Sequence, residues 1–268
     1  MAGTFVSCQK SNIDEPVGKE IVLHLEDDQL GTSVETKTTA VTSMPSSLYW
    51  GGTTGSGGSQ SAKWASASGT VSSSKISTGK FQTATATTYN YYVSNVNMSI
   101  GANTTVSATG GTSGTDVICG YTAGTNSATP SVTLNHIFAR TGTITTSTSA
   151  GSLSNVSYTI VRGSTSVGTS GTYNLRTGAW SSASGLSSDT SISGSSDMYL
   201  IPGAYTIKVT ATYTRGDYQY TATKSGSATL AAGKINNITL NWPAGGTEIQ
   251  VTVSLSGWGS TTASTNIS

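Results

Sequence analysis

The strongest strand signal in the chain is the stretch Tyr205-Thr206-Ile207-Lys208-Val209-Thr210-Ala211-Thr212-Tyr213. Five apolar residues alternate with four polar ones, so one face of this stretch is apolar throughout. A period of two is typical of a β-strand with one buried side. The triplet Arg215-Gly216-Asp217 follows, and alternation resumes at Tyr218. Because Gly and Asp suit a tight turn, we predict a β-hairpin here.

Shorter alternating or apolar runs, separated by Gly- and Ser-rich segments, fill much of the remaining chain. They predict strands at residues 21–25, 80–86, 89–93, 116–121, 132–138, 156–161, 235–242 and 249–255, and a loop at 51–61. No helical period appears between them. The pattern therefore predicts an all-β protein made of antiparallel β-sandwiches.

A Ser/Gly segment near residue 148 suggests a division of the chain. With 268 residues, two tandem sandwich domains fit better than one. We expect residues 1–19 to be a signal remnant and linker, 20–147 to form the N-terminal domain, and 148–268 to form the C-terminal domain.

The composition excludes several classes of protein. Charged residues make up 9% of the chain, against about 25% in an average soluble domain. The net charge is +1 and no basic stripe is present, so no nucleic-acid partner is expected. Abundant Ser and Thr with little charge also occur in disordered stalks. The 35% of hydrophobic residues stand in alternating runs, however, which favours an ordered chain.

The N-terminus resembles a bacterial lipoprotein signal. Ser7 precedes Cys8, apolar residues stand just upstream, and cleavage there would leave Cys8 as the lipidated first residue. A working signal needs a basic region and a longer apolar core than seven residues allow. We expect the natural start to lie further upstream; the alternative is a chance match.

Catalytic and metal-binding signatures are missing. The chain contains no G-x-S-x-G, P-loop, H-E-x-x-H or C-x-x-C motif. Its two histidines, His24 and His136, both lie in apolar stretches of predicted strands, where a structural role is the simplest interpretation. Glu26-Asp27-Asp28 is either a calcium ligand set or a solvated turn. We therefore predict no enzyme, no cofactor and no metal site.

Three further features have a functional and a structural interpretation. Arg215-Gly216-Asp217 is a triplet that integrins recognise on exposed loops, but it is also a suitable hairpin turn. Trp50, Trp64 and Trp180 could stack on sugars or cap the edges of a sandwich. Cys119, within an apolar run, is expected to be a small buried side chain.

The order of these features resembles the fimbrillin family, the type V pilins of Bacteroidetes-type bacteria. The resemblance rests on the following elements in this order: Cys8, the strand at 21–25, Lys37 in a Thr-rich stretch, Val132-Thr133-Leu134-Asn135-His136-Ile137-Phe138-Ala139, Tyr199-Leu200-Ile201-Pro202-Gly203-Ala204-Tyr205, Ala232-Gly233-Lys234-Ile235-Asn236-Asn237-Ile238-Thr239, the strand at 249–255, and Trp258.

The resemblance implies two transthyretin-like β-sandwich domains, exported as an outer-membrane lipoprotein and assembled into a surface fimbria. In such pilins a protease removes the first strand, and the C-terminal strand of a neighbour replaces it by β-augmentation. Here the displaced strand would carry Ile21, Leu23 and Leu25, and processing would occur at Lys37. The donor side chains would be Ile249, Val251, Val253 and Leu255. Family members commonly have Arg where this chain has Lys37, so an Arg-specific protease is not expected to act here.

Two functions follow from the resemblance. The first is a fimbrial subunit that polymerises by donor-strand exchange and supports adhesion, with other fimbrial subunits and a host glycan or protein as partners. The second is a lipid-anchored surface adhesin that binds glycans and never polymerises. In that case residues 249–255 would simply be the last strand of their own domain.

Overall fold

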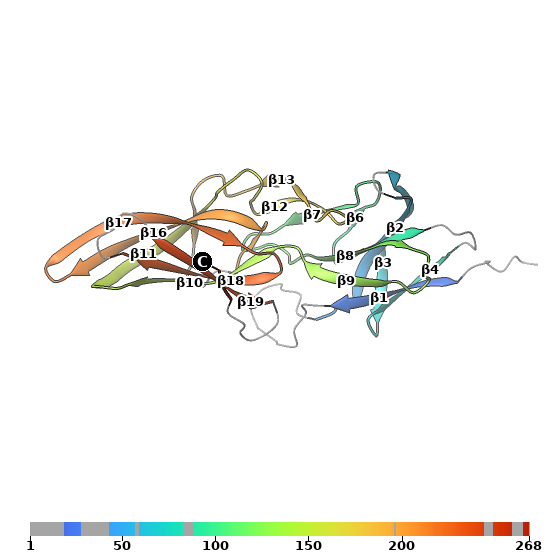
Figure 1. Ribbon diagram of the computed structural model, residues 1–268, viewed down its shortest axis with the longest axis horizontal. Helices are drawn as coiled ribbons and strands as arrows, with labels where there is room; N and C mark the ends of the chain where they lie inside the picture. The colour runs from blue at the N-terminus through green and yellow to red at the C-terminus, as the bar shows by residue number, and fades with distance from the viewer. Residues whose placement is uncertain are drawn as a thin grey trace, which may run out of the picture.

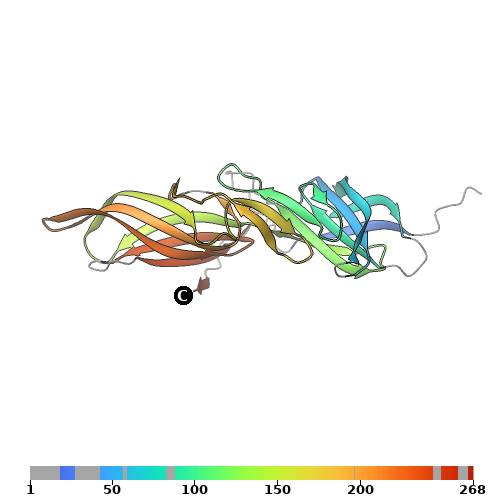
Figure 2. The same ribbon diagram turned by 90° about the horizontal axis from the view of Figure 1, so that it is seen from above.

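The structure is a computed structural model, and it describes residues 19–27, 43–56, 59–82, 88–195, 197–243, 249–258 and 265–267. The molecule is elongated, with the first half of the chain at one end and the second half at the other (Figures 1 and 2). The described residues contain no α-helix, and hence no helix long and apolar enough to cross a membrane. The all-β prediction is confirmed.

The strands follow one another in this order: β1 (Glu20–Asp27), β2 (Ser47–Thr54), β3 (Ser61–Ser72), β4 (Lys75–Phe81), β5 (Tyr89–Ser94), β6 (Met98–Ser99), β7 (Thr105–Thr109), β8 (Ile118–Thr125), β9 (Ser131–His136), β10 (Ala139–Thr148), β11 (Ser152–Arg162), β12 (Ser170–Asn174), β13 (Trp180–Ser184), β14 (Thr190–Ile192), β15 (Tyr199–Leu200), β16 (Gly203–Arg215), β17 (Tyr218–Leu230), β18 (Lys234–Trp242), β19 (Gln250–Gly257) and β20 (Thr265–Ile267).

At one end of the molecule seven strands close into a barrel, in the order β1-β4-β3-β2-β5-β8-β9. The closing strand is β1, which pairs antiparallel with β4 and parallel with β9. The sequence predicted an antiparallel sandwich here; the structure has a closed barrel instead, because β1 pairs along both of its edges. The interior is filled by the buried side chains Ile21, Leu23, Leu25, Leu48, Trp50, Ile76, Tyr89, Tyr91, Val93, Ile118, Val132 and Leu134.

At the other end two sheets pack on each other, with strand orders β15-β10-β18-β19-β20 and β14-β11-β16-β17. The predicted hairpin is confirmed: β16 and β17 pair from Gly203 opposite Leu230 to Arg215 opposite Tyr218. Gly216 turns the chain with a φ of 59°, a left-handed value that glycine adopts without strain. The odd-numbered residues of β16 from Tyr205 to Tyr213 are buried, as the alternation predicts.

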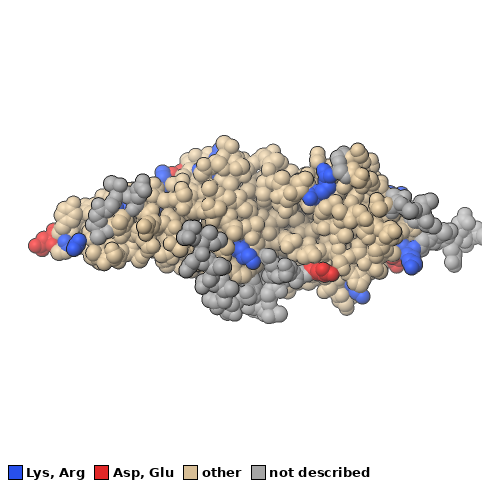
Figure 3. Space-filling view, in the orientation of Figure 1, with Lys and Arg blue, Asp and Glu red and all other residues tan. Residues whose placement is uncertain are grey.

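A third sheet joins the two ends. Its order is β13-β12-β7-β6, and β7 from the first half pairs with β12 from the second, with Thr109 opposite Ser170. One hydrophobic core runs from side chains of the first half, such as Met98 and Val106, to Ile207 and Leu240 of the second. The surface over these elements is largely uncharged, with isolated charged side chains (Figure 3).

The pairing partners change between β9 and β10. β9 ends at His136 and belongs to the barrel, whereas β10 begins at Ala139 and pairs with β15 and β18 of the second half. β10 ends at Thr148 and β11 begins at Ser152, so the Ser/Gly segment is a short connection between the two packed sheets. A domain division at residues 147/148 stays a prediction.

The loop predicted at residues 51–61 is wrong in its first part, because β2 continues to Thr54. Gly51 and Gly52 lie within this strand. A Cβ on Gly52 would stand 2.6 Å from Cε3 of Trp64, and one on Gly51 would stand 2.7 Å from Cδ1 of Ile100. The glycines therefore allow bulky side chains to pack directly on the strand backbone, and the tract is Gly-rich for packing as well as for turning.

We expect Tyr205→Phe to lower the free energy of unfolding by about 1–3 kcal/mol, because it leaves buried backbone groups without a partner. The Tyr205 hydroxyl is 2.7 Å from the Ile201 carbonyl oxygen and accepts the Gly168 N–H at 3.0 Å. Burial raises the pKa of this hydroxyl, so it keeps its proton. Chemical denaturation measures the loss. The control is Tyr218→Phe, since Tyr218 is 65% exposed; equal effects of the two changes would contradict the prediction.

Candidate functional site

The first strand lies in a slot between β4 and β9. On one side Leu23 is opposite Ile76, and on the other Leu25 is opposite Val132. Backbone hydrogen bonds run from the N–H of Val22 to Ala128 O at 2.8 Å and from the N–H of His24 to Pro130 O at 2.9 Å. The segment is thus bound along both of its edges, but only by non-covalent contacts.

The side chains of β1 alternate between the barrel interior and its outer face. Ile21 and Leu23 are fully buried and Leu25 is 6% exposed, whereas Val22 and His24 are half-buried on the opposite face. These three interior residues are the ones predicted to leave the subunit. Two other predicted positions, Cys8 and Lys37, lie outside the described residues.

The strand β19, which holds most of the predicted donor segment, pairs within its own chain, with β18 along one edge and with β20 along the other. Eight consecutive residues are opposite β18, from Gln250 opposite Asn241 to Gly257 opposite Lys234. Val251, Val253 and Leu255 line a groove of about 350 Å³ together with residues of β17, the edge strand of the facing sheet. The predicted donor side chains are therefore only half-buried where they now lie, apart from Ile249, which is 6% exposed.

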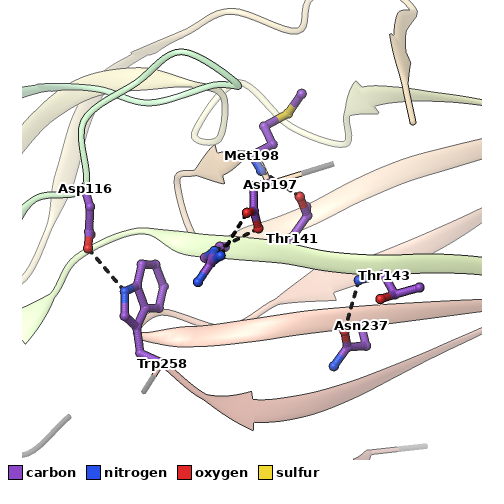
Figure 4. Close-up of polar contacts among 8 residues, drawn as sticks. Asp116, Thr141, Thr143, Asp197, Met198, Asn237 and Trp258 are labelled. Carbon is purple, nitrogen blue, oxygen red and sulfur yellow. Dashed lines mark hydrogen bonds and ion pairs between the residues drawn. The ribbon is translucent and has the colours of Figure 1, made fainter. Parts of the chain in front are cut away.

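Trp258, the residue after β19, is buried at the junction of the two ends (Figure 4). Its indole N–H donates to Oδ2 of Asp116 at 3.2 Å. The imidazole of His136 stacks on it with ring centroids 4.2 Å apart, and the ring of Tyr199 lies at 5.9 Å. The guanidinium of Arg140 is 6.0 Å from the ring centroid. We call Asp116, His136, Arg140 and Tyr199 the Trp258 socket.

The charges of the socket are buried and paired. Asp116 is fully buried, and its Oδ2 lies 3.0 Å from Nδ1 of His136. Arg140 makes two parallel hydrogen bonds of 2.9 Å to the carboxylate of Asp197. A buried carboxylate is tolerated only when donors surround it. The Trp258 indole is one of these donors, so the C-terminal segment completes a polar cluster in the first half of the chain.

Sequence reasoning identified only part of this arrangement. It predicted His136 as a buried structural residue in phase with Val132 and Leu134, and the alternating burial of β9 confirms this. It did not identify Asp116 as a partner, because a lone acidic residue at the start of a predicted strand carries no signal of its own. In the sequence Trp258 stands out only as the last element of the family resemblance. Its hydrogen-bond partner Asp116 is 142 residues away.

The remaining candidates have structural environments. Trp50 is buried in the barrel core, and Trp64 stacks on Tyr91 with ring centroids 6.1 Å apart. Trp180 packs on Phe138 at 5.2 Å. Cys119 is buried, and burial raises the pKa of its thiol. No cluster of three or more His, Cys, Asp or Glu side chains that could hold a metal occurs in the described part of the chain.

These features define a class of protein: an elongated all-β chain with β-sheets at both ends. Its strand β1 is paired along both edges, with β4 and β9, and its strand β19 is paired along both edges, with β18 and β20. The chain belongs to the fimbrillin-like family, whose model matches residues 26–258. The resemblance noted from the sequence is thereby confirmed. A search of curated proteins found no match.

Several solved structures share the fold. A fimbrial protein from Bacteroides vulgatus is 13% identical with a TM-score of 0.57, over 89% of this chain and 99% of that one. A candidate cell adhesion protein from Bacteroides ovatus is 11% identical with a TM-score of 0.51, over 91% and 99%. Another from Bacteroides eggerthii is 15% identical with a TM-score of 0.50, over 90% and 97%. At these identities the similarity establishes the fold alone.

Proposed function

We propose that the chain is a structural subunit of a bacterial surface fimbria, which polymerises by proteolysis-triggered donor-strand exchange and supports adhesion. Membership of the fimbrillin-like family supports the fimbrial role. The proposal includes export as a lipoprotein through Cys8 and two transthyretin-like domains that divide at residues 147/148. Its partners are other fimbrial subunits at the cell surface.

The observation that carries the proposal is the slot of β1. Removal of this strand would leave β4 and β9 with unpaired edges and would open the barrel core where Ile21 and Leu23 are now fully buried. Unpaired strand edges bind another strand readily. An empty slot of this kind therefore requires a replacement strand with apolar side chains at every second position.

Such a replacement is present in the same chain. Ile249, Val251, Val253 and Leu255 follow the period of two that the slot requires. Each apolar side chain contributes about 1.5–3 kcal/mol when it passes from water to a buried site. Since Val251, Val253 and Leu255 are only partly buried in their own subunit, they have some burial to gain in a neighbour. This gain opposes the entropy cost of ordering the donated segment.

A second function is favoured by the pairing of β19 with β18 along its whole length and by the burial of Trp258. A subunit that keeps its last strand would be a lipid-anchored surface adhesin, with a host glycan or protein as partner. It would bind to a glycan array as a monomer and would not form polymers.

The test is limited proteolysis of the full chain after Lys37. We expect loss of the segment that contains β1, followed by ladders that resist mild detergent. Lys37→Gln should block both steps, whereas Lys80→Gln, a change at an exposed residue near the end of β4, should block neither. A subunit that remains monomeric after cleavage at Lys37 would refute polymerisation and favour the adhesin.

A further inference from the structure

The slot of β1 leads directly to the Trp258 socket. β1 runs parallel to β9, and its last residue, Asp27, is opposite Leu134. His136 of the socket is the next residue but one along β9. Both strands point toward the middle of the molecule (Figure 1). β18 begins there and β19 ends there, with Lys234 opposite Gly257. A longer strand in this slot would therefore pass beside His136.

The donor segment has the length that this path requires. Placing Ile249 at the position of Ile21 is a shift of 249 − 21 = 228, which also puts Val251 at the position of Leu23 and Val253 at that of Leu25. The same shift puts Trp258 at position 258 − 228 = 30. Since Asp27 is opposite Leu134, that position is opposite residue 137, directly after His136. In this register position 29 is opposite His136, which is in phase with Val132 and Leu134, so in an ideal strand a side chain at position 30 faces the other way. In its own subunit Trp258 stands at a bend directly after β19, and the same bend in the neighbour would return the indole to the side of His136.

The direction of the donor strand also agrees. β10 begins beside the barrel and runs away from it, and β18 is parallel to β10 and ends at Trp242. β19 returns antiparallel to β18, so Gln250 starts at the far end of the molecule. When β19 is released, the chain after Trp242 can continue off this end. It then enters the next copy, placed end to end, in the same direction as the β1 that it replaces.

We propose that the Trp258 socket is a binding site for Trp258 of a second copy of the chain, which takes the place that the subunit's own Trp258 leaves. The inference rests on the proposed strand exchange. It adds the contact that the C-terminal end of the donated strand makes in the neighbouring subunit. Donation of β19 withdraws an indole from the buried Asp116 carboxylate. The incoming indole restores this hydrogen bond and the stack on His136, so that the cluster is satisfied in the monomer and in the polymer.

A photo-cross-linker beside the socket tests which copy supplies Trp258. Asn135→p-benzoylphenylalanine is suitable, since Asn135 is exposed on β9 and outside the socket. An equal mixture of ¹⁴N- and ¹⁵N-labelled full-length chains is cleaved, polymerised and irradiated. We expect about half of the cross-links from position 135 to the Trp258 peptide to join different isotopes in the polymer, as random mixing of equal amounts of the two copies requires, and only equal isotopes to be joined in the monomer. A polymer with equal-isotope cross-links alone would overturn the inference and leave strand exchange standing. Absence of any polymer would overturn the proposed function itself.

Trp258→Phe tests the contribution of the indole N–H to the polymer. Phenylalanine keeps the stack on His136 but cannot donate to Asp116, and a hydrogen bond to a charged group of this kind corresponds to about tenfold in affinity or more. We expect subunits of this variant to leave the polymer about tenfold faster in mild detergent. The matched control is Trp180→Phe, outside the socket. Equal loss rates for the two variants would count against the trans contact.

Discussion

Replacement of Trp258 by alanine is expected to lower the free energy of unfolding of the monomer by about 3–5 kcal/mol, the range for large aromatic side chains removed from a core. Trp258 is 3% exposed and stacks on His136 and Tyr199. The truncation also removes one hydrogen-bond donor from the fully buried Asp116, which keeps His136 as a partner, and the lost hydrogen bond adds to the loss of stability. Because Trp258 joins the last strand to the first half of the chain, the change should also loosen β19.

Two measurements check this prediction. Chemical denaturation gives the loss of stability, and hydrogen exchange shows whether the amides of β19 lose protection. Tyr218→Ala is the control, because it removes an aromatic side chain that is 65% exposed at the tip of the β16–β17 hairpin. If Trp258→Ala destabilised no more than this control, the socket would not be the anchor of the C-terminal strand.

Replacement of Leu23 by aspartate is expected to detach β1 from its slot. Leu23 is fully buried between the barrel core and its partner Ile76. An unpaired charge at such a site costs several kcal/mol, more than the about 2–5 kcal/mol of a leucine truncation. The barrel should open along β1 while the sheets of the second half remain folded, since their core contains no residue of β1. The opened subunit should accept a donor strand without prior proteolysis.

The same charge on the outer face of the strand is the control. His24 is next to Leu23 but half-buried on the opposite side, opposite Lys75 of β4. His24→Asp should therefore leave β1 in place. The two variants are compared by the rate at which a protease cleaves within β1 and in the sequence next to it. Equal protection of β1 in both would show that the buried face does not hold the strand.

The strands were predictable from the sequence wherever the alternation was strong. β16 was identified from Tyr205 to Tyr213 because a period of two is a local property of the chain, and burial confirms it. β3 was missed, because its Ser, Ala and Gly residues give little contrast between two faces. β2 was missed as well, and its residues from Gly51 onward were predicted as a loop, since the reasons for glycine there are the side chains of Ile100 and Trp64, which pack on the strand backbone.

What the sequence determined by itself is the all-β class, the faces of the long strands, and the family. What only the tertiary structure decided is which strands are neighbours: β1 closes a barrel beside β9, and Trp258 reaches a socket built around Asp116 and His136. The physical reason is that alternation reports which side of a strand is buried, and it does so locally. Strand order and a contact across 142 residues depend on how the whole chain packs, so no local pattern encodes them.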